Sequence, residues 1–323
     1  MQFTMASLAR MITEPILTRW QSLLAGQLSS IRVQLDHQLM LQGRALALQN
    51  SQRSPLRSLQ DAEFKVFSQY GEDGILQYII HESGITRDEQ VFIEFGVQNY
   101  LESNTRFLLQ NDNWRGLIID GSEAYMESVK RSDLYWRHDL TAMAAWIDRD
   151  NINDLFLRSG FSGNIGILSI DIDGNDYWVW ERIEVVSPVI VVVEWNSVFG
   201  PDHAVSIPYN PSFDRGKAHF SSLYWGASMA AFEYLADRKG YVLLGSNKVG
   251  NNLFFVRRDR LGNLQPQTTR TAYVESRFRD SRDAQGKLNF LSGAARHEQI
   301  KDLPVVDITT NLTTTLSELE KAS

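Results

Sequence analysis

Two apolar runs in this chain each end near a carboxylate, and a short stretch of sequence separates them. The first run is Val91-Phe92-Ile93-Glu94-Phe95-Gly96, and about twenty residues later comes Gly116-Leu117-Ile118-Ile119-Asp120. Buried parallel strands deliver such acids to the carboxyl edge of a sheet, where ligands bind. A carboxylate at that edge can take the hydroxyls or the ammonium group of a nucleoside-like cofactor. The gap between the runs holds one helix, as a right-handed βαβ crossover requires.

A third apolar run, at 165–171, opens the most acid-rich segment of the chain. It leads into Asp171-Ile172-Asp173-Gly174-Asn175-Asp176. Asp171 is the first candidate for a general base or for a residue that orients the acceptor. Asp171, Asp173 and Asp176 are also hard oxygen ligands that suit a divalent cation, although no metal site is firmly predicted. Helix capping by Asp173 or Asn175 is the simpler alternative for those two side chains.

A fourth run, at 189–194, ends in Glu194-Trp195-Asn196 beside the acid-rich segment. A carboxylate and an amide there can bind sugar hydroxyls, as Asp173 can, and Trp195 can stack on a pyranose face. An ordinary core position for Trp195 is an equal alternative. The loop at 199–223 is too long for a plain connection, which predicts a role in substrate specificity.

Three histidines are predicted to lie on the ligand edge. They are His138, His203 and His219, and any of them could deprotonate a hydroxyl near neutral pH. For each one alone, a structural role is the favoured interpretation. Together with Asp171, His203 and His219 form the predicted catalytic set.

Composition narrows the class of protein. The 323 residues carry a formal charge of −7, with 43% hydrophobic and 11% aromatic residues. This is the composition of a folded globular protein with no basic field for nucleic-acid phosphates. The absence of cysteine excludes disulfides, thiolate nucleophiles and zinc–thiolate sites, and fits the cytoplasm. No apolar run approaches the length of a membrane span, and the N-terminal residues lack a secretory pattern.

The chain divides into an arm, a core and a tail. Residues 1–50 have an imperfect helical pattern, which predicts a helix packed on its own domain. Dimerisation through this arm and docking on the inner membrane face are the alternatives. Residues 51–260 alternate strand and helix signals and predict one doubly wound domain. Residues 261–323 are polar, and a solvated extension is favoured over a substrate lid.

Within the core, the pattern predicts an α/β Rossmann-like fold, with a mostly parallel seven-stranded sheet that ends in an antiparallel hairpin. Two final strands joined by the short turn 246–250 must be antiparallel, and five parallel strands plus such a hairpin is the plan of a class I methyltransferase. The predicted strands are 91–96, 116–120, 133–138, 165–171, 189–194, 241–245 and 252–256. The predicted helices are 69–82, 103–111, 122–130, 144–159 and 226–239, the last with a glycine cap at Gly240.

Several segments resemble the FkbM-like branch of S-adenosylmethionine-dependent methyltransferases. The resemblance covers about residues 64–260. The segments that carry it are Phe67-Ser68-Gln69-Tyr70-Gly71-Glu72-Asp73-Gly74-Ile75-Leu76, Glu94 to Thr105, Ser169 to Tyr177, Gly226-Ala227-Ser228-Met229, Lys239-Gly240-Tyr241 and Asn251 to Val256. The resemblance implies cytoplasmic O-methylation of a hydroxyl on a sugar, a glycan precursor or a related small molecule, as in polysaccharide synthesis.

In such a fold each acid has an expected place. Glu94 and Gly96 are expected beside the methionine end of the cofactor, with Asn104 or Thr105 capping the next helix near it. A capping or ion-pair role is the alternative for Glu94. Asp120 is expected to accept both ribose hydroxyls, because a carboxylate offers two oxygens to a vicinal diol. Asp139, after the third strand, is expected to receive the adenine amino group, and a helix cap is equally open there. The predicted cofactor-binding residues are Glu94, Gly96, Asn104, Asp120, Ser122 and Asp139.

Two other functions fit parts of the sequence. Asp171 and Asp173 could be the metal-binding pair of a nucleotide-sugar glycosyltransferase. Alternatively, the chain is a noncatalytic interaction protein, because only Gly96 of the usual cofactor-loop glycines is present.

Overall fold

The computed structural model describes the backbone of residues 5–322, and the side chains of these residues except at 5–18, 22, 25 and 29. Its main sheet has seven strands in the order β3-β2-β1-β4-β5-β8-β7. The first five strands are parallel, and β8 runs antiparallel to both β5 and β7. This is the strand order of the class I methyltransferase fold, so the predicted fold is confirmed. The strands are β1 (Val91–Phe95), β2 (Arg115–Asp120), β3 (Leu140–Ala144), β4 (Gly163–Ile170), β5 (Val186–Glu194), β7 (Tyr241–Ser246) and β8 (Asn252–Arg257).

Helices cover both faces of this sheet. Along β5, Val191 and Val193 belong to one buried cluster, whereas Ile190 and Val192 belong to another. Successive side chains of a strand point to opposite faces, so a strand that is buried on both sides has a continuously apolar sequence. The first cluster includes α6 (Ile152–Arg158), α7 (Asp176–Arg182) and α9 (Met229–Lys239). The second includes α2 (Glu72–Ser83), α3 (Arg106–Asp112) and α4 (Glu123–Lys130).

The third strand does not lie where the sequence pattern placed it. Residues Asp133–Arg137 form the short helix α5, and β3 begins only at Leu140. Asp133 starts the first turn of α5, where an acid interacts favourably with the helix dipole, and no α5 residue is buried. The predicted helix at 144–159 is also too long. Asp148 Oδ1 accepts hydrogen bonds from the backbone N–H groups of Asp150 and Asn151, which ends the loop just before α6.

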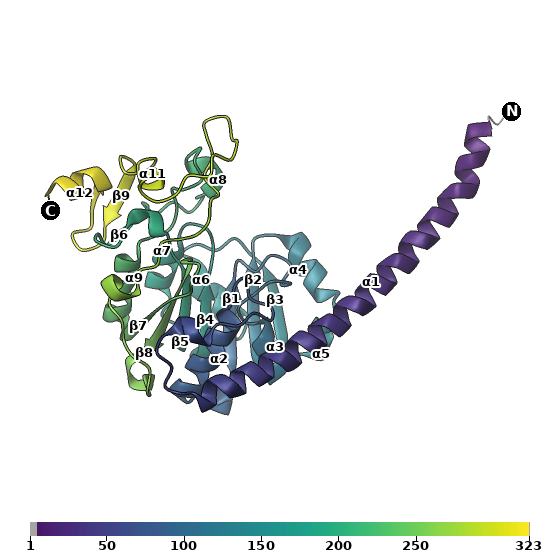
Figure 1. Ribbon diagram of the computed structural model, residues 1–323, viewed down its shortest axis with the longest axis horizontal. Coiled ribbons are helices and arrows are strands. Elements are labelled where there is room, and N and C mark those ends of the chain that lie inside the picture. Colours follow the sequence, from purple (N-terminus) through teal and green to yellow (C-terminus); the bar gives the residue numbers. More distant parts are fainter. Residues whose placement is uncertain (1–4, 323) are drawn as a thin grey trace.

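The N-terminal arm is one long helix, α1 (Met5–Gln52), that projects far beyond the sheet (Figure 1). Among the described side chains of α1, those of its last part pack on the domain. Met40 and Ala47 contact a small apolar cluster beneath the helix, and Asp36 pairs with Arg106 at 3.1 Å. The described apolar side chains further out are exposed, with Leu28 at 65%. The first four residues of the predicted arm lie outside the described residues, and pairing of the arm with a second copy or a membrane stays a prediction.

The C-terminal tail is folded against the segment that follows β5. It contributes β9 (Pro304–Asp307) and β10 (Leu312–Thr315), and β9 pairs with β6 (Val205–Ser206) in a separate three-stranded sheet. The other short helices here are α8 (Arg215–Ala218), α10 (Thr269–Ala272), α11 (Ala294–His297) and α12 (Leu316–Ala322). Figure 1 shows α8, α11 and β9 gathered at one end of the molecule. Within the described part of the chain, no helix combines the length and the apolar character that a membrane span requires.

Candidate functional site

The strand register places four residues of the predicted site in one row. Phe95 of β1 pairs with Ile119 and with Ile170, and Ile170 pairs with Val193. The residues that follow these partners are therefore neighbours at the carboxyl edge of the sheet. Across the sheet, the row is Asp120, Gly96, Asp171 and Glu194. The row explains why acids far apart in the sequence meet at one place.

Gly96 leaves the middle of this row open. Its φ is +77°, and a Cβ built on it would lie 1.5 Å from the backbone carbonyl oxygen of Asp171. Both the left-handed backbone and the close approach of the neighbouring strand require a residue without a side chain. The space between Asp120 and Asp171 is thus free of side-chain atoms from β1.

A cavity of about 730 Å³ lies over this row. Residues at the ends of all five parallel strands line it: Gly96, Asp120, Ala145, Asp171 and Glu194. The tail lines the same cavity through Ser276, Phe278, Asp280, Arg282 and Arg296. Its size lies within the range for sites that hold a cofactor or drug-sized ligand. The sequence favoured a solvated tail, and the tail residues that line the cavity fit the alternative of a substrate lid.

Asp120 holds the loop after β1 and still faces the cavity. Its Oδ2 accepts a hydrogen bond from the backbone N–H of Gln98 at 2.7 Å, and its Oδ1 accepts one from Ser122 N–H at 2.8 Å. Each carboxylate oxygen has a second lone pair, so both remain able to accept from a ligand hydroxyl. Gln98 and Tyr100 have φ values of 49° and 58°. This loop therefore keeps left-handed backbone positions despite having few glycines.

Glu94 does not face the cavity, contrary to the prediction. The register pairs it with Ile118 and Ser169, two residues short of Asp120 and Asp171, so it lies one pleat below the row. Its Oε1 accepts from Asn104 N–H at 2.8 Å, and its Oε2 accepts from Ser103 and Thr105. Burial raises the pKa of Glu94, and these hydrogen bonds oppose the rise. Glu94 thus holds the start of α3.

Asn104 and Ser122 were predicted beside the cofactor, and neither side chain lines the cavity. Asn104 Nδ2 donates to Ser169 Oγ at 3.1 Å. Ser122 is the N-cap of α4, where its Oγ accepts from Tyr125 N–H. Both side chains therefore form hydrogen bonds within the protein, to Ser169 of β4 and at the start of α4.

Asp139 and His138 lie at the wrong edge of the sheet for their predicted roles. Because β3 begins at Leu140, both residues precede the strand rather than follow it. Asp139 also lies beside Arg115, the first residue of β2. The residues that follow β3 and line the cavity are instead Trp146 and Ile147. Trp146 is 60% exposed, and its Nε1 donates to the carbonyl of Pro211 at 2.8 Å.

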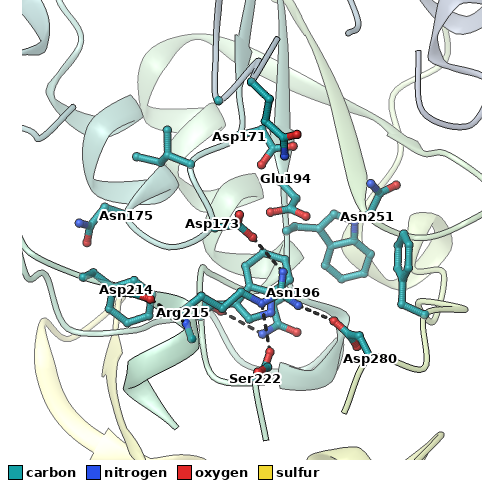
Figure 2. A pocket seen from close by; sticks show the side chains of 18 of the residues that line it. Asp171, Asp173, Asn175, Glu194, Asn196, Asp214, Arg215, Ser222, Asn251 and Asp280 are labelled. Atoms are coloured by element: carbon teal, nitrogen blue, oxygen red, sulfur yellow. Dashed lines mark hydrogen bonds and ion pairs between the residues drawn. The ribbon is translucent and has the colours of Figure 1, made fainter. Parts of the chain in front are cut away.

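Asp171 and Glu194 form a carboxyl pair at the other half of the cavity (Figure 2). Burial, followed by the charges of Asp173 and Asp176, raises the pKa of Asp171 well above its usual range. Burial, followed by the charge of Asp171, raises the pKa of Glu194 in the same way, with Arg215 opposing. Two carboxyl groups in contact titrate as a unit, because ionising both at once is costly.

This pair predicts an unusual response of stability to pH. A carboxyl whose pKa is raised in the folded state contributes stability at low pH that is lost as pH rises through the raised value. The Glu194→Gln variant should therefore unfold with a higher free energy than the wild type at pH 8, with the difference shrinking towards pH 4. Urea denaturation at several pH values measures this, with the exposed Glu184→Gln as control. A constant loss at every pH would contradict the assignment.

Arg215 is a cavity residue that sequence reasoning missed. Its Nη1 pairs with Asp173 Oδ1 at 2.9 Å, its Nη2 pairs with Asp280 of the tail, and its guanidinium lies 4.4 Å from the Trp225 ring centroid. Figure 2 shows Arg215 between Asp173 and Asp280. The residue begins the four-residue helix α8, 42 residues beyond Asp173, and carried no spacing signal.

The acids after β4 do not converge as metal ligands. Asp176 accepts backbone hydrogen bonds from Ile172 at 2.8 Å and from Gly174 at 2.9 Å, so it caps the turn that begins α7. Asp173 has φ +56° and turns outward to Arg215. Among the described residues, no group of three or more acids or histidines has the geometry to hold a metal ion. The metal interpretation of Asp171, Asp173 and Asp176 therefore has no support in this geometry.

Polar groups beside the carboxyl pair remain available. Trp195 is 1% exposed and lines the cavity, and its Nε1 has no hydrogen-bond partner among the described residues. The same holds for Glu194 Oε2. Asn175 Oδ1 also has no partner among the described residues, and Figure 2 shows Asn175 in the cavity lining apart from the pair. The Asn196 amide, by contrast, holds the loop before α9, since its Nδ2 donates to the carbonyls of Leu223 and Trp225.

The two histidines of the predicted catalytic set lie away from the row. His203 lines a separate cavity of about 300 Å³. His219 Nδ1 contacts Ser221 Oγ at 2.7 Å, and burial lowers its pKa. Neither residue lines the larger cavity, so their predicted role as bases for a ligand there is not supported.

Comparisons with known proteins give matches at the level of structure alone. No protein family model matches the sequence, and no curated protein matches it. Among solved structures, the DszA carbon methyltransferase is similar with 12% identity and a TM-score of 0.36, covering 58% of this chain and 53% of that one. The chain thus spans about half the length of that protein. The plantazolicin methyltransferase BamL has 12% identity and a TM-score of 0.35, covering 56% and 81%. The N-terminal domain of EvdMO1, with S-adenosylhomocysteine (SAH) bound, has 10% identity and a TM-score of 0.35, covering 69% and 96%.

Proposed function

We propose that the protein is an S-adenosylmethionine-dependent O-methyltransferase of the FkbM-like branch that acts on a sugar, a glycan precursor or a related hydroxylated small molecule. The observation that carries this proposal is the row of Asp120, Gly96, Asp171 and Glu194 beneath one cavity. In this row, the Asp120 carboxylate can bind the ribose hydroxyls of the cofactor, and Gly96 leaves space for its methionine part. The Asp171–Glu194 pair can bind the acceptor.

The residues present fit the cofactor. Asp120 keeps free lone pairs for two ribose hydroxyls, and Gly96 leaves its neighbourhood open. Trp146 offers an aromatic surface beside it for adenine. S-adenosylmethionine would supply an electrophilic methyl group. The chain's own residues would align the acceptor hydroxyl, exclude water and receive its proton at the Asp171–Glu194 pair, since such displacements depend chiefly on positioning.

The polar groups around the carboxyl pair support a hydroxylated acceptor. Trp195 Nε1 offers a donor, and Glu194 Oε2 and Asn175 Oδ1 offer acceptors, with no partner among the described residues. Buried polar groups left unpaired are costly, so a ligand rich in hydroxyls would stabilise this half of the cavity. We propose that the protein acts in the cytoplasm, a compartment with which the absence of cysteine is compatible.

The experiment is a thermal-shift series followed by a transfer assay. We expect S-adenosylmethionine and SAH to raise the melting temperature at submillimolar concentration, because a ligand that binds only the folded state stabilises it. Adenosine should give a smaller shift. Methyl-tritiated S-adenosylmethionine should then label hydroxylated compounds from a panel of sugars. The absence of any shift at millimolar cofactor would refute the proposal.

A further inference from the structure

In the half of the cavity beside β4 and β5, Asp171, Glu194 and Asp173 lie around one described cation, Arg215. Asp171 and Glu194 meet there, and Glu194 Oε2 has no hydrogen-bond partner among the described residues. The nearest cation is Arg215, which already pairs with Asp173 and Asp280. The acids Asp173, Asp176 and Glu94 also act on the pair, and Arg282 and Arg296 line the same cavity. A ligand cation would complete this arrangement.

The surrounding neutral groups point to a ligand that also carries hydroxyls. Trp195, 1% exposed, and Asn175, 5% exposed, both line the cavity with an unpartnered polar atom within the described structure. Trp195 Nε1 is a donor only, so it requires an oxygen acceptor from the ligand. Asn175 Oδ1 is an acceptor, so it requires a donor. An ammonium group and a hydroxyl group on one small molecule would supply the donor for Glu194 Oε2 and the acceptor for Trp195 Nε1.

We propose that the acceptor is a hydroxylated amine, such as an amino sugar, whose ammonium group binds between Asp171 and Glu194. This rests on the proposed function and narrows its acceptor class. The ammonium would donate to both carboxyl groups, and charge-assisted hydrogen bonds of this kind are stronger than neutral ones. Trp195 would donate to a neighbouring hydroxyl. A neutral sugar would leave the acid pair without its counter-charge.

Binding of a cation should also release a proton from the pair. Free of ligand, two carboxyl groups in contact share a proton, because their charges repel each other. An ammonium ion between them favours the doubly ionised form, so the proton leaves to solvent. This makes the heat of binding depend on the ionisation enthalpy of the buffer, a readout that needs no catalytic turnover.

The test compares D-glucosamine with D-glucose and N-acetyl-D-glucosamine by isothermal titration calorimetry at pH 6.5. We expect at least tenfold tighter binding of D-glucosamine, and a heat that differs between phosphate and Tris buffers. In Glu194→Gln and Asp171→Asn the preference should fall to within about twofold. The exposed Glu184→Gln variant should keep it. Equal binding of the three sugars, or no binding of D-glucosamine, would overturn the proposal.

A second arm separates this inference from the proposed function. The titrations are repeated with saturating SAH, which should leave the preference for D-glucosamine intact because the cofactor is expected on the β1 to β3 side. If SAH displaces the amine, the carboxyl pair holds the cofactor's own ammonium and the inference is wrong. If SAH fails to bind while the preference for the amine persists, the proposed function fails and the cation site stands.

Discussion

Replacing Gly96 by alanine should cost several kcal/mol of folding free energy and eliminate cofactor binding. The left-handed backbone alone costs an L-residue roughly 1–2 kcal/mol. In addition, the new Cβ would lie 1.5 Å from the carbonyl oxygen of Asp171, a contact that only a shift of β1 against β4 can relieve. Such a shift moves Asp120 and Asp171 out of register. Urea denaturation measures the stability, and calorimetry with SAH measures the binding.

A matched control separates the backbone strain from the clash. Gly163 at the start of β4 has φ +74°, and a Cβ there would meet nothing within 4 Å. The Gly163→Ala variant should therefore show only the backbone cost and bind SAH as the wild type does. If both variants lose the same stability and both keep binding, the close approach of β1 and β4 at Gly96 has no role in the site.

Replacing Asp120 by alanine should weaken binding of SAH about a hundredfold. Two hydrogen bonds from ribose hydroxyls to a carboxylate are lost, each contributing about 1.5 kcal/mol or more when one partner is charged. The loop after β1 also loses its anchor, because Asp120 accepts from Gln98 N–H. The Asp120→Asn variant keeps one acceptor oxygen and should lie between the two. Calorimetric dissociation constants for the three proteins measure this.

The control for this prediction is Asp139→Ala. Sequence reasoning placed Asp139 beside adenine, whereas the structure places it before β3 at the opposite edge. Its removal should leave the affinity for SAH unchanged within about twofold. A loss of affinity in Asp139→Ala comparable to that in Asp120→Ala would contradict the position that we assign to the cofactor.

Most of the strands were predictable because their burial leaves a direct record in the sequence. The runs that became β1, β2, β4 and β5 are nearly continuously apolar, as strands covered on both faces must be. The terminal hairpin followed from its short turn. The third strand was misplaced because it lies at the edge of the sheet, where Leu140 and Ala142 alternate with less buried residues. The aromatic run Leu134-Tyr135-Trp136 gave a stronger but misleading signal.

The sequence allowed most residues of the site to be predicted, but not how all of them are arranged in space. Asp120, Gly96, Asp171 and Glu194 were all singled out from strand ends, and they do line the cavity. Glu94 failed because its distance from the sheet edge depends on register, which the hydrophobic pattern sets only to within a pleat. Arg215 lies in the four-residue helix α8, which is too short to show a periodicity, and the tail residues that line the cavity lie in irregular segments. Only the folded chain brings these residues to the acids.

A crystal structure of the protein with SAH tests the central claim most directly. We predict one ligand molecule in the cavity over the strand ends, with both ribose hydroxyls within hydrogen-bonding distance of the Asp120 carboxylate and the adenine ring against Trp146. The homocysteine end should point past Gly96 towards Asp171. Ligand density elsewhere on the molecule, or an empty cavity at saturating SAH, would contradict this account.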